Sequence, residues 1–250
     1  MESLEPGRNF LKSERWDEWG RTETDQKRKI PNPPLQKPAP EGAPLFDLVA
    51  PGAFTLGQIP LIEALRRRRS RRKYTLEPLS LEELSFLLWA TQGVAQILGS
   101  HNKTTQRTAP SAGARHPFET YLSLNRVSGF EPGLYRYLAL DHKLCQIRLD
   151  SSLSEKVGQA CNNQAFVGDC AATFIWAAIP YRTEWRYTFI SHKMIAVDAG
   201  HLCQNLYLAC EAIGAGTCGI GAYNQAKLDA LLGVDGKEEF AIYAAPVGKL

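Results

Sequence analysis

Seven of the 15 prolines lie between Pro31 and Pro51, and this cluster divides the chain into two unlike parts. Proline fixes φ and lacks a backbone donor, so this stretch can form neither a helix nor a central strand. The residues before it are dense in charge, yet they include Phe10, Trp16 and Trp19, and free tails rarely carry such large apolar anchors. We therefore expect residues 1–50 to form an extended, proline-rich arm along a neighbouring surface, and residues 51–250 to form the folded domain.

The composition excludes several classes of protein. With 44% hydrophobic and 22% charged residues, the 250-residue chain is not intrinsically disordered as a whole. No apolar run approaches the roughly 20 residues that span a bilayer, and the first residues lack the basic and apolar regions of a secretory signal. The net charge of +3 is too small to indicate a nucleic-acid partner by itself. We expect a cytoplasmic protein that binds neither membrane nor nucleic acid.

The six cysteines do not indicate a metal site. No two of them form a C-x-x-C pair, and no cysteine and histidine cluster has the spacing of zinc ligands. Cys203 and Cys210 fall on an apolar helical pattern. We interpret the cysteines as reduced, buried thiols and expect no bound metal.

Helical and strand patterns alternate along the rest of the chain, which predicts an α+β fold with a central mixed or antiparallel sheet flanked by helices. Ser80 and Ser152 each begin a capping box, and Gly214 is a candidate for the end of the longest helix. A loop is expected over 99–117. The expected helices are 60–69, 80–93, 152–161, 192–213 and 225–232, and the expected strands are 118–127, 134–140, 143–149, 171–179 and 240–247.

An arginine-rich block carries seven basic side chains in the eight positions 66–73. Like charges this close repel one another, so an acidic partner is expected to offset them. A solvated surface and a nucleic-acid patch remain alternatives, although no aromatic residues are interleaved for base stacking. Guanidinium groups bind phosphate in a bidentate manner, and Ser70 adds a hydroxyl donor. This pattern favours a phosphate site.

Two segments of small residues indicate close approach of the backbone to a ligand. The segment 107–117 is rigid at its ends, with Pro110 and Pro117, and small in its middle. The segment 214–224 contains four glycines in eight residues and superficially matches a dinucleotide fingerprint. That fingerprint must follow a strand within a βαβ unit, whereas this one follows a helix, so we reject a Rossmann site.

Together these motifs resemble the nitroreductase superfamily of flavoproteins over about residues 60–250. Four elements carry the resemblance in order: Arg68-Arg69-Ser70-Arg71-Arg72, then Pro110-Ser111-Ala112-Gly113 with the following His116-Pro117-Phe118-Glu119, then the run 198–206, and Gly219-Ile220-Gly221 followed by the closing 246–249. The pattern is most similar to the SagB-type azoline-peptide dehydrogenase branch.

This resemblance implies an entwined homodimer with non-covalent FMN at the subunit interface, and an arm that wraps the partner. Arg68, Ser70 and Arg72, with Arg69 among them, are implied to hold the phosphate and ribityl chain. The isoalloxazine is implied to lie between residues of the two subunits. Its implied contacts are Pro110, Ser111, Ala112 and Gly113 from one side, Gly219, Ile220 and Gly221 at the other edge, and Asn163 or Gln164 at the ring, with Lys249 as a further phosphate cation.

The substrate is less defined than the cofactor. Azoline dehydrogenases are expected to carry a Lys-Tyr pair for proton removal, where this chain has Arg186-Tyr187. Arginine stays protonated and is a poor base, so Tyr187 remains as a proton donor or relay, or simply as an interface aromatic. Asp198 and His201 form either a proton-handling pair or a polar spot in the dimer core.

Two functions are therefore expected. The first is an FMN-dependent oxidoreductase that passes two electrons, as hydride, between NAD(P)H or an organic donor and a small organic acceptor. The second is an FMN-binding but catalytically silent sensor, or a partner subunit of a complex that modifies peptides. A small molecule or a modified peptide is the expected substrate.

Overall fold

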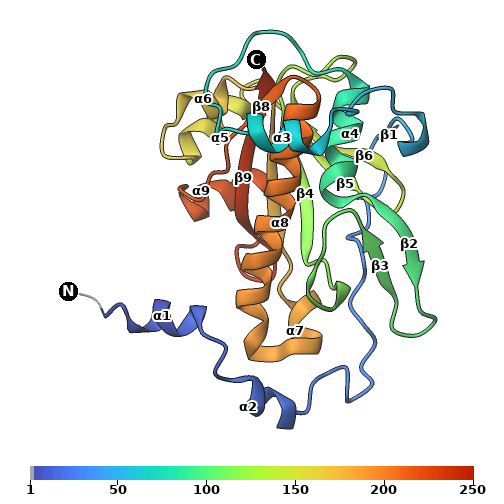
Figure 1. Ribbon diagram of the computed structural model, residues 1–250, viewed down its shortest axis with the longest axis vertical. Coiled ribbons are helices and arrows are strands. Elements are labelled where there is room, and N and C mark those ends of the chain that lie inside the picture. Colours follow the sequence, from blue (N-terminus) through green and yellow to red (C-terminus); the bar gives the residue numbers. More distant parts are fainter. Residues whose placement is uncertain (1–2) are drawn as a thin grey trace.

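The computed structural model describes residues 3–250 and is built on a seven-stranded sheet (Figure 1). Its strand order is β1-β6-β5-β4-β7-β9-β8, and every pair of neighbours in it runs antiparallel. The expected α+β class is confirmed, in its antiparallel form. The strands are β1 Leu45–Asp47, β4 Phe118–Leu124, β5 Gly133–Leu138, β6 Lys143–Leu149, β7 Ala172–Ala178, β8 Ala215–Thr217 and β9 Phe240–Lys249.

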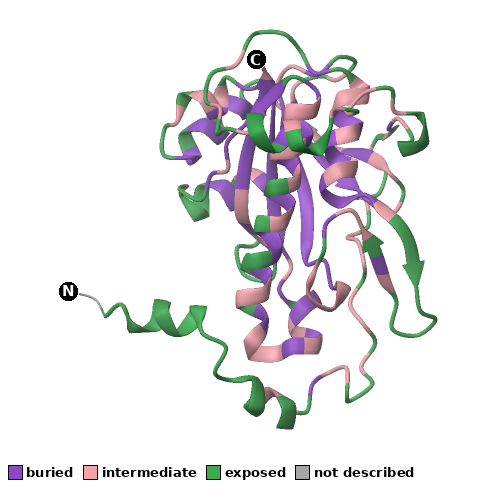
Figure 2. Ribbon diagram, viewed as in Figure 1, coloured by how far each residue is buried: buried purple, intermediate pink, exposed green. Residues whose placement is uncertain are grey.

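Helices cover both faces of this sheet (Figures 1 and 2). The 22-residue α8 and the helix α4 pack on one face, and α5 and α9 pack on the other. The helices of the domain are α3 Leu61–Arg67, α4 Leu81–Gln92, α5 Leu153–Ala160, α6 Ala165–Gly168, α7 Tyr181–Tyr187, α8 Ser191–Ala212 and α9 Gln225–Leu232, with short 3-10 turns at Pro51–Ala53, Ala112–Ala114 and Thr188–Ile190.

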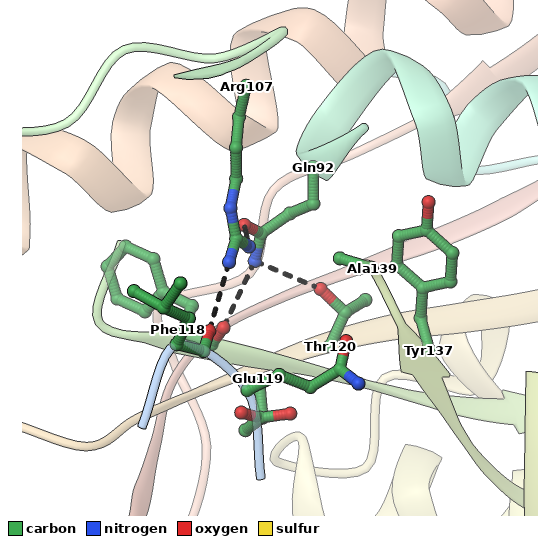
Figure 3. A pocket seen from close by; sticks show the side chains of 9 residues that line it. Gln92, Arg107, Phe118, Glu119, Thr120, Tyr137 and Ala139 are labelled. Carbon is green, nitrogen blue, oxygen red and sulfur yellow. Dashed lines mark hydrogen bonds between the residues drawn. The ribbon is translucent and has the colours of Figure 1, made fainter. Parts of the chain in front are cut away.

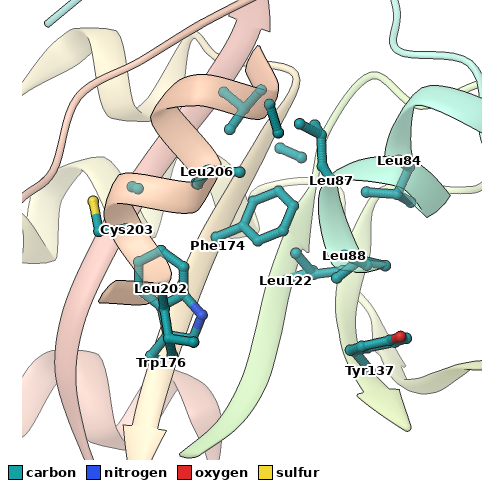
Figure 4. Packing of buried hydrophobic residues seen from close by; sticks show 14 of the residues in the cluster. Leu84, Leu87, Leu88, Leu122, Tyr137, Phe174, Trp176, Leu202, Cys203 and Leu206 are labelled. Carbon is teal, nitrogen blue, oxygen red and sulfur yellow. The ribbon is translucent and has the colours of Figure 1, made fainter. Parts of the chain in front are cut away.

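The interior strand β7 is an uninterrupted apolar run in the sequence because helices cover it on both faces. Side chains alternate across a strand, so Phe174 and Trp176 point towards α4 and α8 while Ile175 points towards α5 and α9. Figure 4 shows Phe174 between leucines of these helices. Burying each such side chain contributes roughly 1.5–3 kcal/mol, so β7 stabilises the packing of helices on both faces of the sheet.

Several local predictions are confirmed and others are wrong. Ser80 forms the expected capping box with Glu83, and α8 ends before Gly214, whose φ is +66°. The second capping box does not form: the Ser152 hydroxyl donates to Asp150 and accepts no amide of its own helix. The expected loop 99–117 contains half of a hairpin, β2 Val94–Leu98 with β3 Thr104–Arg107.

The arm is not extended throughout. Its charged beginning forms two short helices, α1 Glu5–Leu11 and α2 Trp16–Arg21, and β1 joins the edge of the sheet. The proline-rich part between them is extended, as expected, and lies along its own chain. The indole of Trp185 donates to the carbonyl of Ile30 over 2.9 Å, and Arg136 donates to the carbonyl of Pro38 over 2.5 Å. Within residues 3–250, no helix has the length and apolarity needed to cross a membrane.

Candidate functional site

The arginine-rich block continues from α3 into a segment that runs beside β8. Ser70 bridges to Thr217 in parallel, and the amide of Arg71 donates to the Thr217 carbonyl over 2.9 Å. The Ser70 hydroxyl lies 3.0 Å from the Tyr207 hydroxyl on α8, which also accepts the amide of Gly219 over 2.8 Å. The block and the glycine-rich segment, which are about 150 residues apart in sequence, therefore meet around Tyr207.

Most of the guanidinium groups in the block already have partners. Arg66 and Arg67 pair with Glu63 at 3.1 Å and 3.6 Å. Arg69 donates to the carbonyls of Arg66 and Arg68, where it satisfies the end of α3. These bonds offset part of the like-charge repulsion that the sequence predicts.

Arg68 and Arg72 are different. The Arg68 guanidinium lies 5.4 Å above the ring of Tyr207, and that of Arg72 lies 5.9 Å from the ring of Phe166. Among residues 3–250, neither has a carboxylate within 4.0 Å. A half-buried and an exposed guanidinium, Arg68 and Arg72, lie next to a serine hydroxyl and can receive the oxygens of a phosphate.

Gly219 and Gly221, which are predicted to contact the edge of the flavin ring, differ in why a glycine is needed. A Cβ at Gly219 would lie 2.3 Å from the Tyr243 hydroxyl, so packing within the protein requires this glycine. A Cβ at Gly221 would meet nothing within 4 Å. Gln164 donates to the carbonyl of Cys161 and lies against the same segment at Ala222, whereas Asn163 lines a separate surface hollow beside α5 and α6.

Lys249 has partners within the chain. Its ammonium donates to Glu83 over 2.6 Å and to the carbonyl of Ile213 over 3.1 Å. These bonds hold the end of β9 against α4 and α8, which accounts for the lysine without a ligand.

A second group of predicted residues gathers at the other end of α8. The Ser111 hydroxyl donates to Asp198 over 2.6 Å, and the Ala112 amide donates to the same carboxylate over 3.1 Å. Ser111 also accepts the amide of His116 over 2.9 Å. With its proton given to Asp198, the Ser111 hydroxyl can only accept a further hydrogen bond. The sequence did not reveal this role of Asp198, because the partners are 87 positions apart.

Asp198 is not primarily a partner of His201. The closest approach of these side chains, Nδ1 to Oδ1, is 4.0 Å, which is too long for a hydrogen bond. Asp198 is 4% exposed, and burial raises the pKa of its carboxyl, opposed by the bonds from Ser111 and Ala112. The polar-spot interpretation of this pair fits better than the proton-handling one.

The predicted catalytic pair lies against the same loop. Gly113 has φ +58°, and a Cβ there would lie 2.7 Å from the Tyr187 hydroxyl. Trp19 of the arm stacks on the Tyr187 ring at 5.7 Å and donates its indole N–H to the Arg186 carbonyl over 3.2 Å. Arg186 lies 5.3 Å above the Tyr187 ring. The loop 110–113 and the predicted catalytic pair are therefore in contact.

A cavity of about 780 Å³ opens beside this loop. Its walls are Pro110, Ser111 and Ala112, the first half of α8, and residues 6–16 of the arm. This volume is within the range of about 300–1,000 Å³ typical of ligand sites.

The two groups of residues do not meet within one chain. Asp198, which holds Ser111, and Tyr207, which contacts Ser70, are nine positions apart on α8. Nine residues of α-helix advance about 14 Å and turn the chain through about 900°, which places the two side chains on opposite faces. Within one chain, α8 therefore separates the two groups.

A third polar cluster is structural. Gln92 accepts from Arg107 over 2.7 Å and donates to the Phe118 carbonyl and to Thr120, as Figure 3 shows. Burial lowers the pKa of Arg107 to about 10. The hollow beside these residues is about 10 Å³, which is room for about one water. The hydrogen bonds of this cluster hold the β2–β3 hairpin to the sheet, and the hollow is too small for a substrate.

Comparisons with known proteins agree with this architecture. The model of the nitroreductase family matches residues 65–249. A proposed nitroreductase of Methanocaldococcus jannaschii is 33% identical over 192 residues, which are 77% of this chain and 92% of that protein. The crystal structure of a proposed nitroreductase from Ralstonia eutropha superposes with a TM-score of 0.68 at 28% identity, and covers 88% of this chain and 96% of that one.

Two more distant structures share the fold. The NADPH:FMN oxidoreductase of Vibrio harveyi, complexed with NAD+, has a TM-score of 0.52 at 20% identity and covers 76% of this chain and 68% of that one. A chain of the Escherichia coli microcin synthetase McbBCD, solved with truncated pro-MccB17 bound, has a TM-score of 0.59 at 18% identity, over 81% of this chain and 77% of that one.

Proposed function

This chain belongs to the nitroreductase family, and on that premise we propose that it is an FMN-dependent oxidoreductase acting as a homodimer. When bound, FMN would supply reversible two-electron hydride transfer. NAD(P)H is the proposed electron donor, and a small organic molecule is the proposed acceptor. The residues of this chain would bind, orient and shield the cofactor.

The observation that carries the proposal is the pair of uncompensated cations beside Ser70. Arg68 and Arg72 lack carboxylate partners, while the other arginines of the block are paired with carboxylates or bonded to carbonyls. A phosphomonoester carries about −1.5 to −2 charges at neutral pH, which two guanidinium groups would balance. The open space at Gly221 lies along the chain from Gly219, which shares Tyr207 with Ser70.

The division of the site by α8 supports the dimer. The outer face of α8 exposes Gly200, and the helix α3 next to it exposes Leu61, Ile62 and Leu65 at 64%, 54% and 51%. Apolar surface of this kind is typical of a face that a second subunit covers. A second copy on this face would bring its own residues 110–113 towards the Arg68 and Ser70 of the first.

At the isoalloxazine ring, different residues would supply the hydrogen-bond acceptor and the proton donor. Ser111 offers only an acceptor, because its proton goes to Asp198, so it suits an N–H on the ligand. Tyr187 lies behind Gly113 and would donate or relay a proton. Arg186 cannot act as a base, which favours reduction of small acceptors over the peptide oxidation expected of the SagB-type branch.

The experiment uses the purified full-length protein. We expect a yellow protein whose pigment, released by heat, is FMN, and whose bound flavin is bleached by NADPH or NADH under anaerobic conditions. A protein that neither contains nor takes up FMN would overturn the proposal. Tight FMN binding without reduction by either nicotinamide would instead support the silent sensor or partner subunit.

A further inference from the structure

We propose that the cavity beneath residues 6–16 binds an apolar, aromatic-type molecule that carries one negative charge, with Lys193 as its anion contact. This inference rests on the proposed function, for which it names the class of acceptor. The arm segment that roofs the cavity lies outside the family match at residues 65–249.

The walls of the cavity suit a flat apolar body. The lining includes Phe10 and Trp16 of the arm, Phe189 of the 3-10 turn before α8, and Val197 of α8. All four are apolar side chains, and Ser111 and Ala112 also line the cavity. Aromatic and aliphatic walls with a few polar groups are the usual lining of small-molecule sites. A ligand in the cavity would lie beside the loop to which the proposed function gives a flavin contact.

The charges around the cavity leave one cation without an acidic partner. Of the five basic side chains that line the cavity, three are paired: Lys12 with Glu14 at 3.3 Å, Arg15 with Glu18 at 2.7 Å, and His192 with Glu184 at 2.9 Å. A fourth, His201, lies 4.0 Å from Asp198.

Lys193 instead donates to the Ser13 hydroxyl over 2.8 Å, and among residues 3–250 it has no carboxylate within 4.0 Å. Asp198, the buried acid of the cavity, is occupied by Ser111 and Ala112. An ammonium group has three donors, so Lys193 can hold Ser13 and still bind the anionic group of a ligand.

The roof is attached by few contacts, which would let a ligand enter. The helix α1 has no buried residue, and Figure 1 shows it at the outside of the molecule, to the left of the lower half of α8. The roof is connected to the domain by the hydrogen bond between Lys193 and Ser13, by the guanidinium of Arg15, which lies 3.8 Å above the Phe189 ring, and by Trp16, whose ring packs edge-on against Tyr187 at 6.4 Å. Segments with little buried surface open at low cost in free energy.

The test compares a charged probe with neutral analogues of similar shape. Binding of 4-nitrobenzoate, 4-nitrobenzamide and nitrobenzene to the full-length protein is followed by quenching of tryptophan fluorescence, which needs no turnover. We expect 4-nitrobenzoate to bind at least about tenfold more tightly than either neutral probe, as expected for one charge-assisted contact. Equal affinity for all three probes would overturn the proposal.

Variants then assign the selectivity to its residues. Lys193→Met is expected to weaken 4-nitrobenzoate binding about tenfold and to leave 4-nitrobenzamide within about twofold, while Lys193→Arg keeps the preference. The matched control Lys12→Met, which removes a cation already paired with Glu14, is expected to change neither probe. Trp16→Ala is expected to weaken all three probes. An unchanged preference in Lys193→Met would overturn the assignment.

Failure of this inference is distinguishable from failure of the proposed function. Each fluorescence titration is repeated on protein stripped of flavin and on protein reconstituted with FMN. A charge preference in a protein that binds no FMN would remove the oxidoreductase and keep the anion site. An FMN-loaded, NAD(P)H-reducible protein without the preference would keep the oxidoreductase and remove the anion site.

Discussion

Ser111 donates its hydroxyl proton to Asp198 over 2.6 Å, so one carboxylate on α8 sets the direction of the hydroxyl in the neighbouring loop. The same carboxylate accepts the Ala112 amide. Asp198 thereby fixes two polar groups of the segment to which the proposed function gives a flavin contact. The loop 110–113 and α8 are therefore joined by hydrogen bonds at this point.

Replacing Asp198 by asparagine tests this coupling. The amide nitrogen would face a donor where the carboxylate presented an acceptor, so Asp198→Asn is expected to lower the free energy of unfolding by about 1–3 kcal/mol. FMN affinity is expected to fall as well. Urea unfolding of the apoprotein and a flavin titration measure the two effects. His201→Gln is the control, because His201 makes no hydrogen bond to Asp198, and an equal loss in both variants would contradict the coupling.

The phosphate assignment is tested at Arg68. Arg68→Ala is expected to weaken FMN binding by about 1.5–3 kcal/mol, the usual contribution of a hydrogen bond to a charged group. The matched control is Arg66→Ala, which removes an exposed arginine paired with Glu63 and should leave the affinity unchanged. Equilibrium titration with FMN decides, and equal affinities in the two variants would show that Arg68 only covers Tyr207.

Two glycines separate ligand contact from packing. Gly221→Ala adds a methyl group in open space, so the apoprotein should unfold at an unchanged denaturant concentration while FMN binds more weakly. Gly113→Ala places its Cβ 2.7 Å from the Tyr187 hydroxyl at a positive φ, so it should destabilise the apoprotein itself. A Gly221→Ala protein with full FMN affinity would exclude a flavin contact at this position.

His116 predicts a loss of stability in acid. Burial is the main cause that lowers its pKa from 6.5 to about 3, helped by the charges of Arg107 and Arg115. Below pH 6.5 the unfolded chain binds a proton that the folded chain refuses, so stability falls as the pH drops towards 3. Each pH unit in that window costs up to about 1.4 kcal/mol, or about 2 kcal/mol between pH 7.5 and 5.

Urea unfolding at these two pH values checks the prediction. The comparison is His116→Asn, because asparagine tolerates the positive φ at this position and does not titrate. The variant should show a difference between pH 7.5 and 5 that is smaller by about 2 kcal/mol. The same stability difference between pH 7.5 and 5 in both proteins would mean that other groups cause the loss of stability in acid.

The proposed dimer face is tested at Gly200. This residue is exposed, and a Cβ there would meet nothing within its own chain. Gly200→Arg should leave the monomer fold intact but block a second helix from approaching. Light scattering after gel filtration is expected to give a dimer for the natural sequence and a monomer for the variant. Leu98→Arg, on the exposed β2 strand, serves as control, and a natural protein that elutes as a monomer would contradict the dimer.

The elements that sequence reasoning located well are those whose pattern reflects local packing. The apolar spacing of α8 and the continuous apolar run of β7 are recognisable in the sequence because the apolar strip of each element packs against the core. The helix α7 was not expected, since it has no such strip. It is held by distant partners, with Arg182 paired to Glu119 and Trp185 bonded to the arm.

The candidate site shows the same limit. Motif order was enough to propose the arginine-rich block, the loop 110–113 and the glycine-rich segment. It could not show that Arg69 turns back onto α3 or that Lys249 is neutralised by Glu83. Nor could it show that the arm roofs a cavity. These features depend on which chemically similar side chains reach one another after folding.

The docking of the proline-rich arm bears on how fast the molecule forms. Lys37 pairs with Glu239 across 202 positions, and Ile30 accepts from Trp185 across 155. Forming each such contact requires closing a long chain loop, which costs conformational entropy before the contact is made. Topologies rich in distant contacts therefore fold slowly. We expect the arm to be the last part to settle, with a refolding phase that disappears when residues 1–40 are removed.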